Sequence, residues 1–448
     1  MKKIDLTTAP INSSLILFSL PLILSFLMNI IYSWIDMYFV SRLGEMEVSA
    51  LGVSEQLLFF IFAIGSGFGV GTGIMIARRI GERNYEKANH TAAQAIAFTV
   101  LSSIIIAFVL YLNIPTILSV MKIEGHVAEL AHIYISILIF GVPANFFIFQ
   151  INSIVRATGN GNFQFYILFL TIVLNIIFAP IFIFGVGFIP KMGVAGAGLA
   201  TASAQYIGAI VAIIAVLLNT TQINISFRKF RIDWNIIKRI VILGVPASLQ
   251  LMVVSLNRIG ITTFANQFGN EVLNTYILGL RVDLFVTMFI IATGAAIEVT
   301  TGQNLGANKL DRVYKYFKAA LVQVSIIMVV LITLVFFFGK EFADIYTDNP
   351  LLIHNVDIYF KYTMFSYIPF ALGIISLRVI SGAGDYFRTL KIVVLANFLI
   401  QIPVAFLLSH YTSIGYEGIW LSFIITQIVF AILSFISLKN KKWLKVKV

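Results

Sequence analysis

A single carboxylate, Asp36, lies within the first long apolar stretch of the chain, where a charged group is costly. Polar residues precede it at steps of three or four, namely Ser25, Asn29, and Tyr32 or Ser33. This spacing places them on one helical face, so the stripe is expected to face other helices. Burial favours the neutral form of a carboxyl group, so Asp36 is suited to proton exchange. The structural alternative is an acid that hydroxyls and amides satisfy for packing alone.

The composition shows that the elements around Asp36 must lie in a membrane. Of 448 residues, 59% are apolar and 11% are charged, whereas about 25% are charged in ordinary soluble proteins. The mean hydropathy is +0.95. Soluble cores could not bury so much apolar surface, and 40 Phe and 17 Tyr exclude a disordered chain. The absence of cysteine excludes disulfides and a thiol nucleophile.

Twelve apolar runs are long enough to cross a bilayer as helices. We predict an all-α integral membrane protein with spans at 14–40, 51–76, 92–112, 128–150, 162–187, 194–218, 239–266, 273–301, 315–338, 353–377, 388–409 and 416–438. The first run is too long for a signal peptide and is interpreted as a retained span. The glycines at 65–73 lack the lysine and strand of a phosphate loop, and indicate close helix packing.

Basic residues predict the orientation of the spans. Twenty-four lysines and arginines lie at the ends of the chain and in one set of loops, against five in the alternate loops. Both termini are therefore expected in the cytoplasm, with the chain crossing the inner (cytoplasmic) membrane many times. The basic excess indicates contact with anionic membrane lipids and not with nucleic acid.

The two halves of the chain form an internal repeat. Four pairs share one sequence offset of 225: Pro21 and Pro246, Gly44 and Gly269, Gly81 and Gly306, and Gly159 and Gly384. This ordered set predicts two pseudo-symmetric six-helix lobes, residues 1–218 and 237–448, joined by a cytoplasmic linker at 219–236. A parallel duplication of this kind places a substrate path between its halves.

These residues resemble the multidrug and toxic compound extrusion (MATE) family of secondary transporters. The resemblance rests on Phe18-Ser19-Leu20-Pro21-Leu22, Asp36, Gly44 with Ala50-Leu51-Gly52, Met192-Gly193-Val194-Ala195-Gly196-Ala197 and Gly302-Gln303-Asn304-Leu305-Gly306-Ala307. Thr8-Ala9-Pro10-Ile11 and the sparse acids favour the DinF-like prokaryotic branch. The resemblance implies a MATE-like fold and cation-coupled antiport.

The resemblance also implies a cation site in the N-lobe. Its equivalents here are Asp36, Asn152, Asn175 and Thr201, and the polar stripe adds Tyr32 and Asn29. The family pattern Asn-x-x-x-Asp-Pro has Ala179 in place of its acid, so a second carboxylate is missing. Fewer charges favour a proton over sodium. Sodium held by Asp36, Asn175 and Thr201 is the alternative, and no other metal site is expected.

Two further features carry hypotheses. By resemblance, Pro21 is a hinge for span 1, with a tolerated membrane-helix proline as the alternative. In the C-lobe, Arg258 and Asp283 are candidate site residues, although a structural ion pair is the favoured interpretation. Glu298 lies near the cytoplasmic end of its span, where solvent or a loop cation would satisfy it.

These patterns together predict a transporter and not an enzyme. No ATPase motif, catalytic cluster or metal spacing is present in the sequence, so an ion gradient must supply the energy and no cofactor is expected. We expect a monomer that exports small organic molecules, cationic or amphiphilic, through proton exchange at Asp36. Sodium-coupled export is one alternative. Export or flipping of a dedicated metabolite or lipid-linked intermediate is another.

Overall fold

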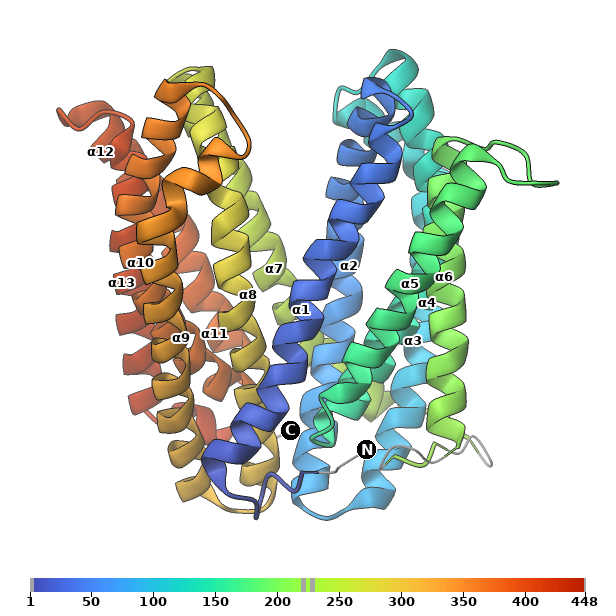
Figure 1. Cartoon of the computed structure of the whole chain (residues 1–448). Helices are drawn as coiled ribbons and strands as arrows, with labels where there is room; N and C mark the ends of the chain where they lie inside the picture. The colour runs from blue at the N-terminus through green and yellow to red at the C-terminus, as the bar shows by residue number, and fades with distance from the viewer. Residues whose placement is uncertain (1–3, 219–222, 226–229, 447–448) are drawn as a thin grey trace. The chain divides into compact units, whose positions relative to one another are not determined.

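A computed structural model describes residues 4–218, 223–225 and 230–446 of the chain (Figure 1). Twelve helices in this part are long and apolar enough to cross a membrane, as predicted. They are α1 (Ile11–Ser41), α2 (Glu45–Gly81), α3 (Tyr85–Val120), α4 (Gly125–Ala157), α5 (Asn162–Phe184), α6 (Val194–Leu217), α7 (Trp234–Gln267), α8 (Asn270–Gly306), α9 (Leu310–Asp344), α10 (Pro350–Gly382), the span Tyr386–Tyr411 and α13 (Glu417–Lys439).

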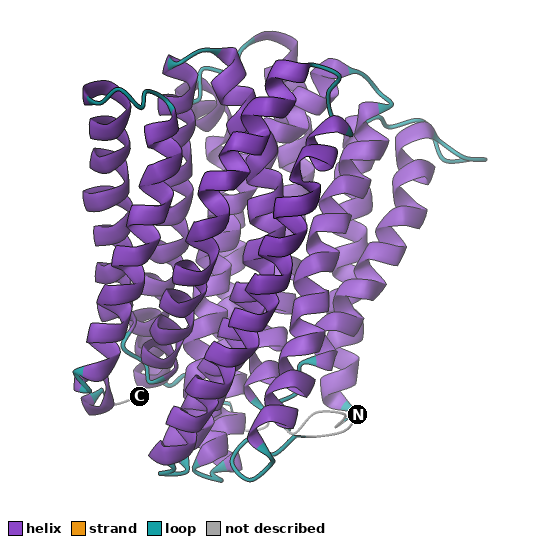
Figure 2. Cartoon of the chain, turned by 60° about the vertical axis from the view of Figure 1, so that its left-hand side comes forward, coloured by secondary structure: helices purple, strands orange, loops and turns teal. Residues whose placement is uncertain are grey.

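The eleventh span joins three pieces: α11 (Tyr386–Val394), a π-helical segment (Leu395–Gln401) and α12 (Ile402–Tyr411). A short 3-10 helix follows α13 at Lys442–Lys445. No strand occurs among the residues that the structure describes, as Figure 2 shows. Much of the predicted linker 219–236 lies outside the described residues.

The duplication is visible in the backbone. Gly44 and Gly269, a pair with the offset of 225, precede α2 and α8 with φ of 154° and 100°, which side chains rarely adopt. Arg83 and Asn308 have the same offset and take φ of 57° and 55° in the turns after α2 and α8. Matching turns at one offset confirm that the two halves repeat one helical plan.

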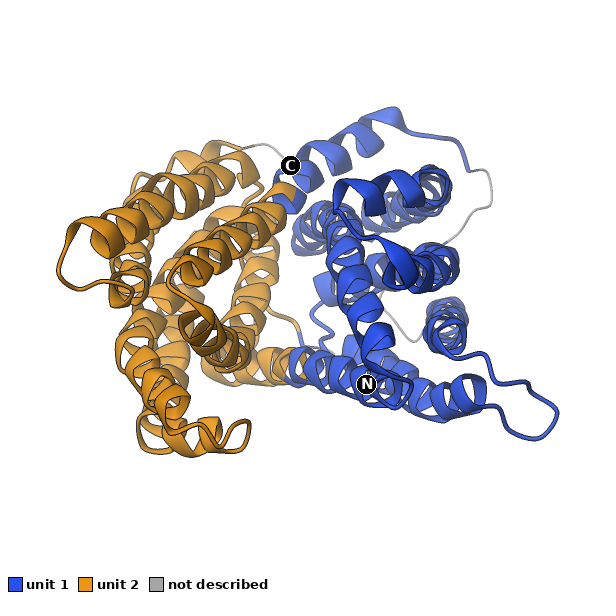
Figure 3. Cartoon of the chain, turned by 90° about the horizontal axis from the view of Figure 1, so that it is seen from above, with its two compact units in different colours: residues 1–4, 24–248 blue, residues 5–23, 249–448 orange. Residues whose placement is uncertain are grey.

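The chain forms two compact units, coloured separately in Figure 3. Unit 1 is Met1–Ile4 and Leu24–Ser248, and unit 2 is Asp5–Ile23 and Leu249–Val448. The crossover points, after Ile23 and after Ser248, again differ by the offset of 225, and each follows a repeat-related proline by two positions. The units therefore differ from the predicted lobes because the first helix of each repeat starts within the other unit.

In unit 1, α4 packs against α2, α3 and α6, and α5 packs against α6. The glycines of α2 also meet the start of α7. A Cβ atom at Gly67 would lie 2.5 Å from the Gly244 carbonyl oxygen, and one at Gly71 would lie 2.6 Å from that of Ile240. The glycines therefore permit close helix approach, as predicted.

In unit 2, α10 packs against α8, α9 and α13. Its core contains a group of buried aromatic rings. The ring centroids of Tyr359 and Trp420 are 4.8 Å apart, and those of Tyr276 and Trp420 are 5.9 Å apart. A Cβ atom at Gly279 would overlap the Tyr359 ring, so only glycine admits the ring there.

Residues 5–10, here called the N-terminal segment, are bound by the α8–α9 region of unit 2. The Leu6 carbonyl oxygen accepts hydrogen bonds from Asn304 (3.2 Å), Arg312 (3.2 Å) and Tyr316 (3.1 Å). Lys309 donates to the Thr7 carbonyl at 2.9 Å. These contacts hold the start of α1 against unit 2.

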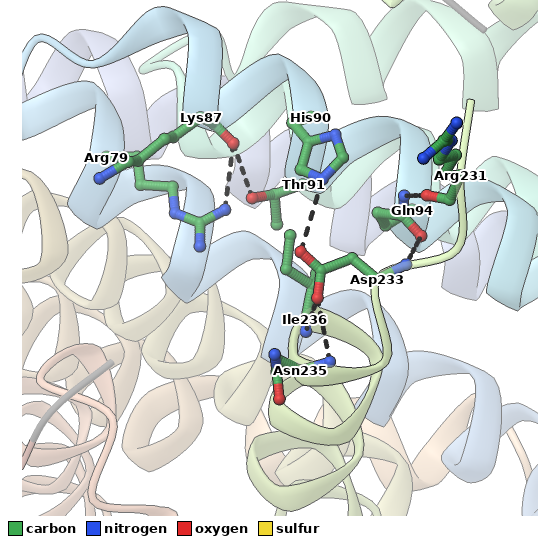
Figure 4. A network of polar contacts seen from close by, with 9 residues as sticks. All are labelled: Arg79, Lys87, His90, Thr91, Gln94, Arg231, Asp233, Asn235 and Ile236. Carbon is green, nitrogen blue, oxygen red and sulfur yellow. Dashed lines mark hydrogen bonds and ion pairs between the residues drawn. The ribbon is translucent and has the colours of Figure 1, made fainter. Parts of the chain in front are cut away.

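The segment before α7 is bound in a corresponding way by α3 of unit 1 (Figure 4). Gln94 donates to the Arg231 carbonyl at 2.5 Å and accepts from the Asp233 amide at 3.0 Å. His90 lies 3.6 Å from the Asp233 carboxylate. Leu6 and Arg231 also show the offset of 225, so the two carbonyls that receive these bonds are repeat-related.

Candidate ion-coupling site

The predicted N-lobe site rests on an apolar layer of unit 1. Val40, Leu51, Ala179 and Ile183 pack together in one buried cluster that also contains Tyr134, so helices α1, α2, α4 and α5 meet there. Helical periodicity turns Tyr32 and Asp36, on successive turns of α1, to the same side. This apolar packing thus holds in place the helices that carry the polar side chains of the site.

Asp36 is the final acceptor in a short chain of hydrogen bonds that involves side chains of α5 and α6. The Thr201 hydroxyl donates to Asp36 Oδ2 over 3.4 Å. The Asn175 amide donates to the Thr201 hydroxyl (3.0 Å) and to the Tyr32 hydroxyl (3.2 Å). Tyr32 also donates to Thr201 at 3.3 Å. Asn175 is fully buried, so this chain connects the acid to the interior of the unit.

Two of the candidate residues lie outside this chain. Asn29 donates to the carbonyl of Ser25 in its own helix, at 3.1 Å. The side-chain carbonyl of Asn152 is buried and has no hydrogen-bond partner among the described residues. The structure thus brings together Tyr32, Asp36, Asn175 and Thr201.

The sequence analysis missed two groups beside Asp36. Glu55 on α2 interacts electrostatically with Asp36 and lies within hydrogen-bonding reach of Ser33. Tyr134 on α4 is 3% exposed and interacts with both acids. Glu55 was visible in the sequence as an acid inside the second span, but its partner was not, because α1 and α2 meet only in the folded unit.

Glu55 changes the charge count at the site. Ala179 is 1% exposed within the apolar cluster and leaves α5 without an acid. A second carboxylate is nevertheless present, on α2 instead of α5. Two neighbouring carboxylates repel each other, and the repulsion favours uptake of a proton or a cation.

The C-lobe acid Asp283 has different partners from those predicted. Tyr367 donates to Asp283 Oδ1 at 2.6 Å, and Tyr359 donates to Oδ2. The predicted ion pair with Arg258 is not among the ion pairs of the described residues, although the two charges interact over a longer distance. Phenol hydroxyls from α10 satisfy the carboxylate because that helix packs directly against α8.

Glu298 has its own partners, which differ from those of Asp283. It was expected to be solvated or to pair with a loop cation, and the structure shows neither. It is 9% exposed and pairs with Arg378 at the end of α10, with N and O 2.8 Å apart. Tyr386 donates to its other carboxylate oxygen at 2.6 Å. This buried pair joins α8, α10 and α11.

The repeat places an uncharged counterpart of the N-lobe site in unit 2. Asn257 corresponds to Tyr32, and its amide donates to Gln401 at 2.9 Å, one residue past the counterpart of Asn175. Gln401 is the last residue of the π-helical segment of the eleventh span. Asp36 corresponds to Ile261, so only unit 1 carries an acid at this position.

The described residues contain no group of three or more His, Asp or Glu side chains that could hold a metal ion. Apart from the Glu55 carboxylate, the oxygen atoms near Asp36 belong to the hydroxyls of Tyr32 and Thr201 and to the amide of Asn175. The arrangement can keep an acid hydrogen-bonded while it exchanges a proton with its surroundings.

Comparison with known proteins places this architecture in a family. The MatE family pattern matches residues 21–181 and 246–407, once in each repeat. A probable multidrug resistance protein, YoeA of Bacillus subtilis, is 27% identical over 92% of this chain and 89% of its own length. The multidrug export protein MepA of Staphylococcus aureus is 23% identical over 94% of this chain and 91% of its own.

A solved structure of a MOP superfamily transporter from Pyrococcus furiosus has the same fold, with a TM-score of 0.92 and 23% identity over the full length of both chains. The family match covers both halves and includes Asp36 and Asn175, whereas Thr201 on α6 lies outside the matched residues. The chain is therefore an integral membrane protein that belongs to the MatE, or multidrug and toxic compound extrusion, family of transporters.

Proposed function

We propose that the protein is a proton-driven antiporter that exports small organic, cationic or amphiphilic compounds across the cytoplasmic membrane. Family membership and the names of YoeA and MepA support multidrug export. Proton uptake at Asp36 drives the cycle. The basic loops support a cytoplasmic location for both termini, and we expect the protein to work as a monomer without a cofactor.

The observation that carries the proposal is the hydrogen-bond chain that ends on Asp36. Tyr32, Asn175 and Thr201 all supply donors to it, and Asn175 Oδ1 is the buried oxygen of these three side chains that has no hydrogen-bond partner within the described residues. A sodium ion prefers a full shell of oxygen ligands. The proton is the better match, and Glu55 adds a repulsive charge that favours it.

Sodium coupling is the second candidate, and Glu55 is the observation that favours it. Together Asp36 and Glu55 would provide two negative charges, which offset the dehydration of a cation better than one. Export of one dedicated metabolite or lipid-linked intermediate would use the same ion site. A resistance assay with several unrelated dyes separates these substrates, since broad protection indicates multidrug export.

The central experiment measures export in inside-out vesicles under an imposed proton or sodium gradient. We expect a proton gradient alone to drive accumulation of ethidium in wild-type vesicles. Asp36→Asn should abolish it, because the amide keeps the size of the carboxyl but cannot exchange a proton. Asp357→Asn is the matched control, since Asp357 is an ion-paired acid of unit 2.

Normal export by Asp36→Asn would refute the role of Asp36. Accumulation driven by sodium alone, and lost in the same variant, would replace the proton with sodium.

A further inference from the structure

A group of exposed lysines lies at one end of α11 and α13, two helices that pack against each other. The members, here called the basic patch, are Lys391 near the start of α11 and Lys439, Lys441, Lys442 and Lys445 at the end of α13 and in the turn after it. None of them forms an ion pair with any of the described residues. The protein therefore leaves these positive charges without a partner of its own.

The turn after α13 is held by a buried tryptophan. The Trp443 side chain is fully buried, and its indole N–H donates to the carbonyl of Leu438 at 2.8 Å, which satisfies an acceptor at the helix end. Lys441 takes a φ of 53°, which a lysine rarely adopts, and the 3-10 helix follows at once. Side chains three residues apart in a 3-10 helix eclipse each other, so Lys442 and Lys445 point to the same side. The turn thus presents its lysines from a fixed backbone.

The apolar surface of α13 leads directly to the basic patch. Ile432 and Phe435 are each half exposed, and Lys439 follows them on the same helical face at steps of three and four. On α11, Phe387 is also exposed and shares a face with Lys391, four residues later. Because both helices belong to membrane spans, these exposed apolar side chains contact acyl chains. The lysines beside them therefore lie at the level of the lipid headgroups.

Other cations of unit 2 are bound by the protein itself. Arg312 donates to the carbonyls of Leu6 and Ala9, and Arg388 pairs with Asp385 at 2.7 Å. The Asp385 charge, close to Lys391 in the sequence, is therefore already matched by an arginine. The lysines of the basic patch differ because their charges are free to attract an anion from outside the protein.

The first repeat has no equivalent of the basic patch. Gly196 and Gly418, at the start of α6 and α13, have an offset of 222. With this offset, residues 217–223 correspond to 439–445, and they contain no charged residue. The lysines are therefore a property of the second repeat and not of the helical plan that both repeats share.

We propose that the basic patch binds the headgroup of an anionic phospholipid, with the acyl chains of that lipid lying along the exposed apolar face of α13. The phosphodiester offers a negative charge and several oxygen acceptors to neighbouring lysines, whereas a zwitterionic headgroup has no net charge to attract them. The apolar surface beside Lys439 favours a lipid over a soluble anion, which has no acyl chain to place there. The inference goes beyond the proposed export function and does not depend on the coupling ion.

The test is equilibrium binding of fluorescent phosphatidylglycerol to the purified full-length protein in detergent micelles. Phosphatidylcholine with the same acyl chains and the same fluorophore is the comparison lipid. We expect the wild type to prefer phosphatidylglycerol at low salt. This preference should disappear in about 1 M salt, where charges are screened beyond about 3 Å.

Removal of the five charges should weaken binding of phosphatidylglycerol by about ten-fold or more, because the lysines supply most of the attraction. The variant for this measurement carries Lys391→Gln, Lys439→Gln, Lys441→Gln, Lys442→Gln and Lys445→Gln. Arginine at the same five positions should retain the preference, since the positive charges are kept.

A matched control variant loses five other exposed lysines, which are spread over α3, α7 and α9. It carries Lys87→Gln, Lys238→Gln, Lys315→Gln, Lys318→Gln and Lys340→Gln. The change in net charge is the same, so this variant should bind phosphatidylglycerol as the wild type does. An equal loss of binding in both glutamine variants would show that the net charge of the protein, and not the basic patch, attracts the lipid.

Thermal unfolding of each variant checks that the fold is intact. If the glutamine variant of the basic patch does not fold, the salt dependence of the wild type and the arginine variant still test the role of the charges. Equal affinity of the wild type for both lipids, or wild-type affinity in the glutamine variant, would overturn the proposal. Displacement of the lipid by the same concentration of glycerol phosphate would also overturn it, since the site would then take a soluble anion and not a lipid.

Discussion

Two carboxylates from different helices, Asp36 and Glu55, interact electrostatically at the candidate coupling site. Thr201 donates to Asp36, and Ser33 lies within reach of Glu55, so each acid has its own hydroxyl partner. Their mutual repulsion links the protonation of one to the charge of the other. Under the proposed proton coupling, we therefore expect the charge of Glu55 to influence the pH range of export.

This coupling predicts the behaviour of Glu55→Gln. Loss of the repulsive charge makes ionised Asp36 less unfavourable, so the midpoint of the pH profile of export should move to lower pH, on the order of one unit. Initial rates of ethidium export in vesicles at a series of pH values measure the shift. Asp357→Asn, which removes an ion-paired acid of unit 2, is the control and should leave the midpoint of the wild type in place. An unchanged profile for Glu55→Gln would show that the two acids act independently.

Among the helices, the first one of each repeat is divided between the two compact units. α1 starts in unit 2 and ends in unit 1, and α7 starts in unit 1 and ends in unit 2. A proline sits two residues before each crossover, where the missing backbone hydrogen bond permits a bend. α1 continues from its proline to Asp36, the proposed coupling acid, whereas the corresponding position of α7 is Ile261.

We therefore expect Pro21→Ala to lower the rate of export. Pro246→Ala should lower this rate by a smaller factor. The alanine restores a straight, stiffer α1 between its unit 2 start and Asp36 in unit 1. Rates of proton-driven export, compared with equilibrium binding of tetraphenylphosphonium, separate slowed turnover from lost affinity. Equal rates for wild type and Pro21→Ala would favour an ordinary tolerated proline.

The N-terminal segment should hold the start of α1 in a pH-dependent way. Partial burial would raise the pKa of Asp5, but hydrogen bonds from Thr7 and Thr8 and the charge of Lys309 keep that pKa below its usual range. A depressed pKa stabilises the segment above the unfolded-state pKa, and this stabilisation is lost as the pH falls through the folded-state pKa. Neutral conditions therefore favour the bound segment.

Hydrogen exchange of residues 5–10, corrected for the intrinsic rate, measures this attachment. We expect Arg312→Gln to increase exchange at neutral pH, because Arg312 binds the carbonyls of Leu6 and Ala9. Asp5→Asn should remove the acid-dependent part of the change, and Lys315→Gln is the control cation on α9. Exchange in Arg312→Gln that matches wild type would show that the segment is held by other contacts.

At the scale of the whole molecule, the exchanged helix starts make the two repeats depend on each other. The glycine face of α2 packs against residues 240–248 of α7, which belong to the second repeat. The start of α1 is bound in turn by Tyr316 and Arg312 of α9. Neither repeat contains all the helices of one compact unit.

Splitting the chain between residues 225 and 226 should therefore give halves that are unstable alone and stable together. Each half alone exposes a face that the other half covers, with glycines and carbonyls left unpacked. Co-purification of differently tagged halves from one membrane, against each half expressed singly, measures the effect. Stable accumulation of either half alone would contradict the interdependence inferred from the crossovers.

The membrane environment, the twelve spans and the duplication follow from the amino-acid sequence without any structure. Each depends on local or periodic properties: runs of about 20 apolar residues, alternating basic loops, and matching residues at an offset of 225. Asp36 was identifiable for the same reason, because an acid within an apolar run is costly wherever the helix lies. The packing role of the α2 glycines also followed from composition alone.

The partners of each acid depend on how the helices pack in the folded protein. Glu55 beside Asp36, and the two tyrosines on Asp283, come from helices far apart in the chain. The expected ion pair of Asp283 with Arg258 was wrong. The donors nearest to an acid depend on how its helix is rotated and packed, and the pattern of apolar spans does not encode this. The crossovers after Ile23 and Ser248 likewise depend on which surfaces bury each other, and that is a property of the folded chain.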